Sequence, residues 1–228
     1  MDFLFNFVDV QEEENFGNSK KDILKYLKII GVDTRFVSYF ENRVYINNLR
    51  FSKFSKSREK TFAKQYPEIE VVRSTLFKKI CSKSSKVLSD IAPGTAILLS
   101  NEKSPLNDLM YIILEPYTRK YGLKLVYDGD FDLIADPLLL DDETNRIFSE
   151  IFRGEGIDFD FKDERKIYPL LHVSKKWVED FLEVKIENEK EDKLASDFME
   201  FLDTVSPQYM ENVLRASEFI ESQLEVEK

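Results

Sequence analysis

The chain has 228 residues, of which 43% are apolar and 13% aromatic, so it is long enough for one ordinary domain with appendages and too apolar for wholesale disorder. Its 43 acidic and 33 basic residues give a formal charge of −10, and its single cysteine, Cys81, excludes a disulfide framework and any zinc or iron–sulfur site built on several of its own thiolates. No apolar run approaches the roughly 20 residues that span a bilayer, and the start at Met1 lacks a secretory pattern, so we expect a cytoplasmic protein without a membrane partner.

The first ninety residues predict a strand–helix–strand unit followed by a basic segment. The expected elements are a strand over residues 3–10, a helix over 19–27 that stops at Gly31, a strand over 34–40, and helices near 58–66 and 75–88. A helix between two strands favours a right-handed crossover. We expect the remainder of residues 43–90 to be irregular.

The rest of the chain alternates strands and helices more regularly. The expected elements are a strand over 97–99, a helix over 106–120 closed by Gly122, a strand over 123–127, a connection over 128–140, a helix from Asp141 to Gly154, a strand over 167–171, a helix capped by Ser174, and helices over 194–204 and 207–223. This alternation predicts a Rossmann-like α/β domain over residues 1–182, with a mainly parallel sheet flanked by helices. Residues 194–228 are expected to form a C-terminal helical region.

Residues 140–154, L-D-D-E-T-N-R-I-F-S-E-I-F-R-G, resemble a signature of the tRNA-thiolating PP-loop ATP pyrophosphatases, roughly G-H-N-L-D-D-E-A-E-T-x-x-M-N-x-L-R-G. The matching positions are Leu140, Asp141, Asp142, Glu143, Arg153 and Gly154. The pattern over residues 195–218 resembles the terminal helices of cytosolic thiouridylase subunit 2, a family that shows G-D-S where active enzymes have G-H-N. Gly129 and Asp130 are the candidates for that degenerate position.

The resemblance implies a degenerate PP-loop fold and a non-catalytic role in tRNA wobble uridine 2-thiolation. The implied partners are the catalytic thiouridylase subunit 1, in a heterodimer, together with tRNA and a ubiquitin-like sulfur carrier. That complex places sulfur at C2 of uridine 34 in the tRNAs for lysine, glutamate and glutamine. For this chain we therefore expect no catalytic residue, no metal site and no cofactor of its own.

The departures from the enzymes concern the phosphate loop. PP-loop enzymes hold pyrophosphate on the backbone amides and serines of an S-G-G-x-D-S loop, and no such motif occurs in this chain. Residues 100–104, S-N-E-K-S, follow an apolar strand but lack both glycines, and Glu102 would repel phosphate. They also lie late in the fold order that the resemblance implies. The sequence therefore predicts a chain that begins after the loop has been lost.

Charge is distributed unevenly along the chain. Residues 1–90 carry 17 basic and 12 acidic residues, whereas the remaining 138 carry 16 and 31, and residues 43–86 alone carry 12 basic and 3 acidic. Phenylalanines and tyrosines are interleaved with these cations, a combination that meets both phosphates and unstacked bases of RNA. The predicted RNA-binding residues are Arg43, Arg50, Lys53, Lys56, Arg58, Lys60, Lys64, Lys78, Lys79, Lys83 and Lys86. The alternative is a solvated surface loop.

Other chemistry-bearing residues admit two interpretations each. Cys81 beside three lysines is a sulfur-carrying nucleophile or an ordinary cysteine, and His172 is a general base or a structural residue. Residues 141–143 are Mg²⁺ ligands or acids that favour a helix start, and Trp177 is a base-stacking platform or a core aromatic. Two alternative functions remain open: a divergent nucleotide-dependent transferase using Asp141, Asp142 and Lys103, and an acidic protein-interaction adaptor without RNA contact.

Overall fold

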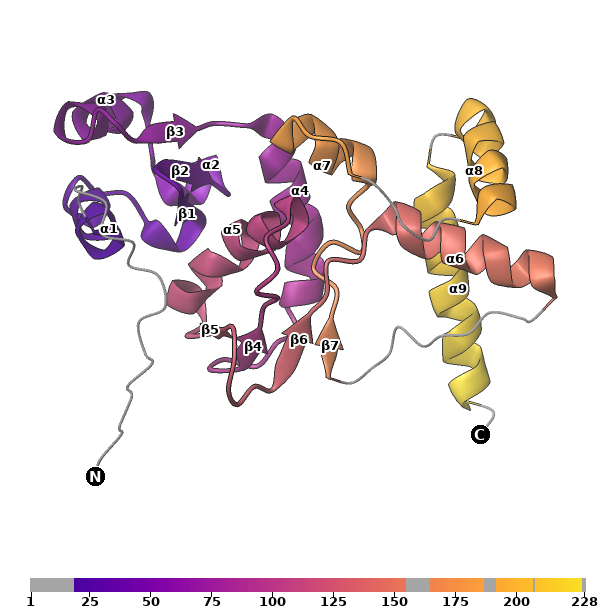
Figure 1. The fold of residues 1–228 in the computed structure, drawn as a ribbon. Coiled ribbons are helices and arrows are strands. Elements are labelled where there is room, and N and C mark those ends of the chain that lie inside the picture. The colour runs from indigo at the N-terminus through magenta and orange to yellow at the C-terminus, as the bar shows by residue number, and fades with distance from the viewer. Residues whose placement is uncertain (1–18, 155–164, 187–191, 207, 227–228) are drawn as a thin grey trace.

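The structure is a computed structural model that describes residues 19–154, 165–186, 192–206 and 208–226. Its elements form two sheets, with a group of helices at the C-terminal end (Figure 1). The strand predicted over residues 3–10, and with it the start of the expected crossover unit, lies outside the described residues. None of the described helices is long and apolar enough to cross a membrane.

The first sheet is small and mixed. Its strands are β1 (Val37–Phe40), β2 (Arg43–Ile46) and β3 (Glu70–Val72), with β1 antiparallel and β3 parallel to β2. Its helical elements are α1 (Lys20–Ile29), the 3₁₀ helix η1 (Thr34–Phe36), α2 (Leu49–Ser52) and α3 (Lys56–Gln65). Glu41 and Asn42 both have positive φ, which lets a two-residue turn join β1 to β2.

The first sheet corrects two predictions. The strand expected over residues 34–40 begins as η1, because the Asp33 side chain accepts a hydrogen bond from the Arg35 backbone and caps a helical turn there. Residues 43–90 are not irregular outside their helices, since they supply β2 and β3. Both strands are very short, and their pairing partners lie across a turn or a helix, so no local pattern marks them. The helices near 58–66 and 75–88 are confirmed as α3 and α4 (Thr75–Leu88).

The second sheet is entirely parallel and has the strand order β5-β4-β6-β7. Its strands are β4 (Ala96–Leu98), β5 (Lys124–Val126), β6 (Leu133–Ala135) and β7 (Lys166–Ile167), and the helices that follow β4, β6 and β7 are α5 (Pro105–Lys120), α6 (Leu140–Arg153) and α7 (Lys175–Leu182). The prediction of an α/β fold with a parallel sheet flanked by helices is confirmed. Strand β6 was missed, and the strand expected over 167–171 ends at Ile167 because the chain turns between Tyr168 and Leu171.

Helix α5 joins the two sheets. It contacts η1 and β1 of the first sheet as well as β5 of the second. The larger core, which includes Leu109, Ile113 and Ile97, lies between α5, α4 and the parallel sheet, while a second core around Phe54 and Phe62 lies under the first sheet. The molecule therefore has two hydrophobic cores connected through one long helix.

The C-terminal helices α8 (Lys193–Val205) and α9 (Tyr209–Val226) both pack on α6 (Figure 1). Aromatic residues fill the junction: the Phe148 ring meets Phe198 edge-on at a centroid distance of 5.1 Å, and Tyr209 is almost fully buried beside it. The prediction of helices at this end of the chain is confirmed, and their core is built on α6, the helix formed by most of residues 140–154.

Candidate functional site

The order of the parallel strands places a topological switch point between β4 and β6. From β4 the chain first continues outward to β5 and then returns to the other side of β4 to form β6. In open parallel sheets, ligands bind outside the carboxyl ends of the strands at such a point. Residues 100–104 follow β4 directly and open α5, so they occupy the loop at this position. That residues 100–104 lie late in the fold order implied by the resemblance stays a prediction, and the loop at this position has no glycine.

The loop over residues 100–104 satisfies its own backbone. The Ser100 hydroxyl accepts a 3.1 Å hydrogen bond from the Glu102 backbone N–H, and the Ser104 hydroxyl caps α5 by accepting one of 3.2 Å from the Asn107 backbone. The Asn107 side chain in turn donates to the Glu102 carbonyl at 2.7 Å. The Glu102 amide is thus already paired within the loop, and Lys103 is exposed beside it.

The acids that open α6 act as helix caps. The Asp141 side chain accepts a 2.7 Å hydrogen bond from the backbone N–H of Lys175, the first residue of α7, and burial raises the pKa of this carboxyl. The Asp142 side chain accepts a 3.3 Å hydrogen bond from the backbone of Leu139, which completes one half of a capping box. Asp141 therefore positions the start of α7 after β7, a role that needs an oxygen acceptor and not a charge.

The remaining α6 motif residues make an ion-pair ladder and a helix end. Glu143, which is 1% exposed, binds the Arg146 guanidinium through both oxygens at 2.6 and 3.0 Å. Arg153 pairs with Asp192 at 3.0 Å, and Gly154 ends the helix in the left-handed conformation with φ of +71°.

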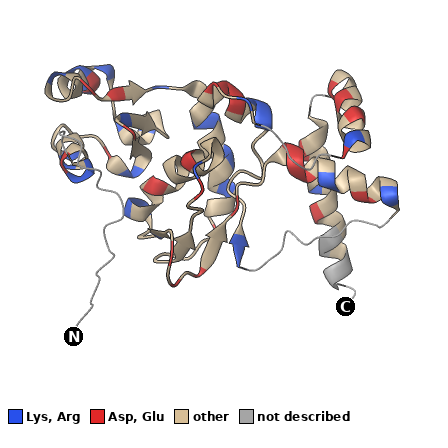
Figure 2. Ribbon diagram, in the orientation of Figure 1, with Lys and Arg blue, Asp and Glu red and all other residues tan. Residues whose placement is uncertain are grey.

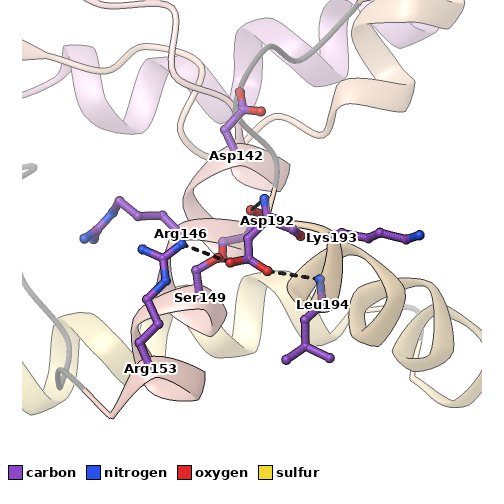
Figure 3. A pocket seen from close by; sticks show the side chains of 8 residues that line it. Asp142, Arg146, Ser149, Arg153, Asp192, Lys193 and Leu194 are labelled. Carbon is purple, nitrogen blue, oxygen red and sulfur yellow. Dashed lines mark hydrogen bonds and ion pairs between the residues drawn. The ribbon is translucent and has the colours of Figure 1, made fainter.

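An open depression of about 520 Å³ lies where α8 meets α6 (Figure 3). It is lined by Asp142, Asn145, Arg146, Ser149, Arg153, Asp192, Lys193 and Leu194. The Asn145 amide donates to the Ser196 hydroxyl at 2.9 Å, and the Asp192 backbone donates to the Asn145 side chain at 3.1 Å. Both arginines of this depression are paired with carboxylates, and the contacts of Asn145 with Ser196 and of Arg153 with Asp192 join α8 to α6.

Gly129 and Asp130, the candidates for the degenerate G-D-S, are exposed in the connection from β5 to β6. Gly129 has φ of +80°, which the turn requires. No hydrogen bond or ion pair within the described part of the chain joins Asp130 to α6. The structure thus does not link these two residues to the α6 motif through polar contacts.

Cys81 lies on α4, half-buried against the larger core. Burial raises the pKa of its thiol, so little thiolate forms near neutral pH, in spite of the neighbouring lysines. Trp177 also packs against this core, with the Lys79 ammonium 5.7 Å from its ring centroid. Among the described residues, no group of three or more His, Cys, Asp or Glu is arranged to hold a metal ion.

His172 lies between α4 and α9, where its Nδ1 atom is 3.9 Å from a Glu211 carboxylate oxygen. Burial is the largest influence and lowers the His172 pKa, Glu211 raises it, and Lys86, Lys83 and Arg215 lower it further. Since the pKa in an unfolded chain is about 6.5, the folded state binds this proton less tightly and loses stability as the pH falls below that value.

We expect the free energy of unfolding to decrease between pH 7 and pH 5.5 in the wild-type chain, and to decrease less in His172→Gln. The Glu211 pKa is lowered by its cationic neighbours, so its own titration falls below this window. Urea denaturation at both pH values measures the difference. Equal losses in the two proteins would mean that another group titrates.

The predicted RNA-binding residues divide into three groups. Arg43 pairs with Glu70 at 2.9 Å, and Lys83 pairs with Glu211 of α9. Arg58 donates to the Lys53 carbonyl and packs against Gly31, so it has a structural role. The third group consists of the candidates that form no ion pair with a described residue: Arg50, Lys53, Lys56, Lys60, Lys64, Lys78, Lys79 and Lys86.

A second depression, of about 400 Å³, brings two of these candidates together. It is lined by Asn47, Asn48, Leu49, Arg50 and Lys78, so it joins α2 to α4. Figure 2 shows the basic residues of α3 and neighbouring segments at the opposite end of the molecule from the C-terminal helices. Two further cations, Arg35 and Lys120, lie outside the predicted segment and were missed, although each stands next to an aromatic residue in the sequence.

No protein-family model matches the chain, and no curated protein matches it significantly. Among solved structures, the chain is similar to the U34-tRNA thiolase NcsA from Methanococcus maripaludis with its [4Fe-4S] cluster, at 14% identity and a TM-score of 0.46, over 68% of this chain and 83% of that one. At that identity and TM-score the similarity supports no conclusion about the fold or the activity of this chain, and the cluster is a property of that protein.

Proposed function

We propose that this chain is a non-catalytic subunit of a tRNA 2-thiolation complex, in which it supports sulfur transfer to wobble uridine 34 by the catalytic thiouridylase subunit 1. The observation that carries the proposal is the use made of the thiolase-like motif on α6. The motif follows β6 at the switch point of a doubly wound sheet, yet Asp141 caps a neighbouring helix and Glu143 is neutralised by Arg146. Open parallel sheets bind ligands at such a position, whereas these side chains make contacts within the fold.

Two further observations support a role without chemistry of its own. The loop after β4 has no glycine, and its Glu102 amide is paired with the Ser100 hydroxyl. Cys81 has a raised pKa, which disfavours its use as a sulfur nucleophile. A nucleotide-dependent transferase using Asp141, Asp142 and Lys103 is the competing proposal, and calorimetric titration with ATP and Mg²⁺ tests it directly; saturable binding would favour it.

The proposal also needs a surface that contacts tRNA, and the lysines around α3, which we call the basic face, are the candidate. Lys53, Lys56, Lys60 and Lys64 are exposed around α3 and pair with no described carboxylate. The whole-chain charge of −10 opposes a polyanion, but at physiological salt the screening length is only about 8 Å, so these lysines act locally. We therefore assign this face to tRNA held by the heterodimer, and the acidic C-terminal helices to other contacts.

Depletion of the chain from its source cell is expected to remove most 2-thiouridine from the tRNAs for lysine, glutamate and glutamine, as measured by mass spectrometry of nucleosides. Wild-type chain should restore the modification. Asp141→Asn should restore it too, because the amide keeps an oxygen for the Lys175 backbone while removing a charge. Undiminished 2-thiouridine after depletion, or failure of Asp141→Asn in a stably folded chain, would contradict the proposal.

The contribution of the basic face is tested with the purified heterodimer. Charge reversal of Lys53, Lys56 and Lys60 to Glu should weaken tRNA binding and reduce the slope of log affinity against log salt by about 2 to 3. The matched control reverses three exposed lysines elsewhere: Lys124, Lys176 and Lys193. Equal effects of the two triple variants would show that tRNA does not bind at this face. The chain would then be better explained as an acidic protein-interaction adaptor that does not contact RNA.

A further inference from the structure

Three dipeptides that each place a cation next to an aromatic residue converge on one surface. They are Arg35-Phe36 in η1, Arg50-Phe51 in α2, and Lys120-Tyr121 at the end of α5. The convergence follows from the packing of η1 against both α2 and α5. In the sequence the first and last of these pairs are separated by the whole of the first sheet and the start of the second.

The rings of this surface, together with Tyr117, form what we call the aromatic strip: Phe51, Phe36, Tyr117 and Tyr121. The Phe51 and Phe36 centroids are 5.3 Å apart with the rings inclined at 30°. The Lys120 ammonium continues the strip, at 5.6 Å from the Phe36 centroid and 4.7 Å from that of Tyr121, and the Tyr117 ring lies 5.7 Å from Tyr121.

The two ends of the aromatic strip are open to solvent. The Phe51 side chain is 53% exposed and that of Tyr121 is 38% exposed, whereas the aromatic residues of the nearby core, Phe54 and Phe62, are completely buried. Because about half of Phe51 is exposed to water, the chain forgoes the stabilisation that burying the whole ring would provide. The position of Phe51 on Phe36 holds the ring while leaving much of it for another molecule.

Cations outnumber carboxylates around the aromatic strip. Arg50 and Lys120 form no ion pair with a described residue, and Lys120 is held over three rings, Phe36, Tyr117 and Tyr121. Arg35 is also present, paired with Asp33 at 2.7 Å. Burial raises the Tyr117 pKa to about 12, so the phenol stays neutral and adds no negative charge.

We propose that the aromatic strip binds unpaired nucleotides of RNA, with bases stacking on Phe51 and Tyr121 and phosphates meeting Arg50 and Lys120. Aromatic faces bind bases that are not already stacked in a helix, and cations beside them meet the backbone. A protein partner would use the same apolar rings, but Arg50 and Lys120, which are present in addition to the Arg35–Asp33 pair, leave an excess of positive charge that favours a polyanion. The proposal deepens the proposed function and rests on it for the identity of the RNA, since it names unpaired nucleotides as what this chain contacts.

The test uses the full chain at low salt with two fluorescent probes, an unstructured 12-nucleotide RNA and a 12-base-pair RNA duplex. We expect the single strand to bind more tightly than the duplex. Phe51→Ala should weaken single-strand binding by about tenfold or more without changing its salt slope, because a stacking contact releases no counterions. Arg50→Ala with Lys120→Ala should reduce the slope instead. Phe201→Ala, an equally exposed phenylalanine on α8, is the matched control.

A second variant separates stacking from a structural role. Phe51→Trp should bind like the wild type, and the emission of the introduced indole, measured against the Trp177 background, should be quenched by single-stranded RNA. Unchanged binding by folded Phe51→Ala, equal affinity for strand and duplex, or no quenching in Phe51→Trp would overturn the proposal. If Phe51→Ala loses single-strand binding but depleted cells keep normal 2-thiouridine, the aromatic strip is an RNA site and the thiolation role is rejected.

Discussion

Replacing Glu115 with Gln is expected to lower the free energy of unfolding by about 3 kcal/mol, since it leaves the largely buried Arg119 and the half-exposed Lys20 without their counter-charge. Glu115 lies in the middle of α5 and is 1% exposed. Its carboxylate binds both terminal nitrogens of Arg119 one turn later, and the Lys20 ammonium of α1 at 3.0 Å. The Lys20 ammonium also donates to the Tyr111 hydroxyl at 2.6 Å.

The Glu115 cluster matters because Arg119 holds the first sheet onto α5. Its guanidinium donates to the Thr34 carbonyl at 3.0 Å and to the Val37 carbonyl at 2.7 Å, which lie in η1 and at the start of β1. Without the carboxylate, the Arg119 charge is poorly compensated, which makes it less favourable for the arginine to stay at the position where it forms these bonds. The same substitution should therefore loosen the attachment of the aromatic strip.

The control for this variant is Glu70→Gln. Glu70 pairs with Arg43 at 2.9 Å, but both side chains are more than half exposed, so solvent screens the pair and the expected loss is below about 0.5 kcal/mol. Urea denaturation followed by circular dichroism compares the two. Similar losses for Glu70→Gln and Glu115→Gln would show that burial does not strengthen the Glu115 cluster.

The helices could be predicted closely because their signals are local. The helix expected over residues 106–120 is α5, which begins one residue earlier, at Pro105, and is capped by the Ser104 side chain. Gly154 marks the end of α6 and does adopt the left-handed conformation there. Such signals need only residues within one turn of the chain, so one sequence is enough to place them.

The short strands could not be predicted, since their pairing is decided elsewhere. Strand β6 has three residues, and it is a strand because Ile97 and Leu98 of β4 lie on one side and β7 on the other. Strand β3 pairs with β2 across the intervening α2 and α3. In both cases the partner lies outside any window in which a pattern can be read.

The same limit applies to the candidate site. Counting cations identified the basic segment, but whether a cation is free depends on distant residues: Lys83 is neutralised by Glu211, which is 128 positions away. The sequence allowed Asp141 to be a metal ligand, but in the fold its carboxylate accepts a hydrogen bond from the backbone of Lys175, which is 34 positions away. Phe51 and Lys120 become parts of one surface only because η1 lies between their helices.

Phe62→Ala is expected to destabilise the first sheet by about 3 to 5 kcal/mol, the cost typical of removing a buried ring. Phe62 on α3 is completely buried and lies among the rings of Phe54, Tyr66 and Tyr26 at centroid distances of 6.0, 5.2 and 6.4 Å.

The core around Phe62 is separate from the core of the parallel sheet, so the effect of Phe62→Ala should be local. Hydrogen exchange should quicken for amides of α1 to β3 more than for those of β4 to β7. Single-stranded RNA binding should fall together with that protection, since a hydrogen bond of 2.8 Å from the Asp33 backbone to the Ser52 carbonyl ties the end of α2 to the start of η1. Leu109→Ala, in the core of the parallel sheet, is the reciprocal control and should affect β4 to β7 first. Uniform loss of protection in both variants would mean that the two cores unfold as one unit, and the RNA surface would then be no more labile than the rest of the chain.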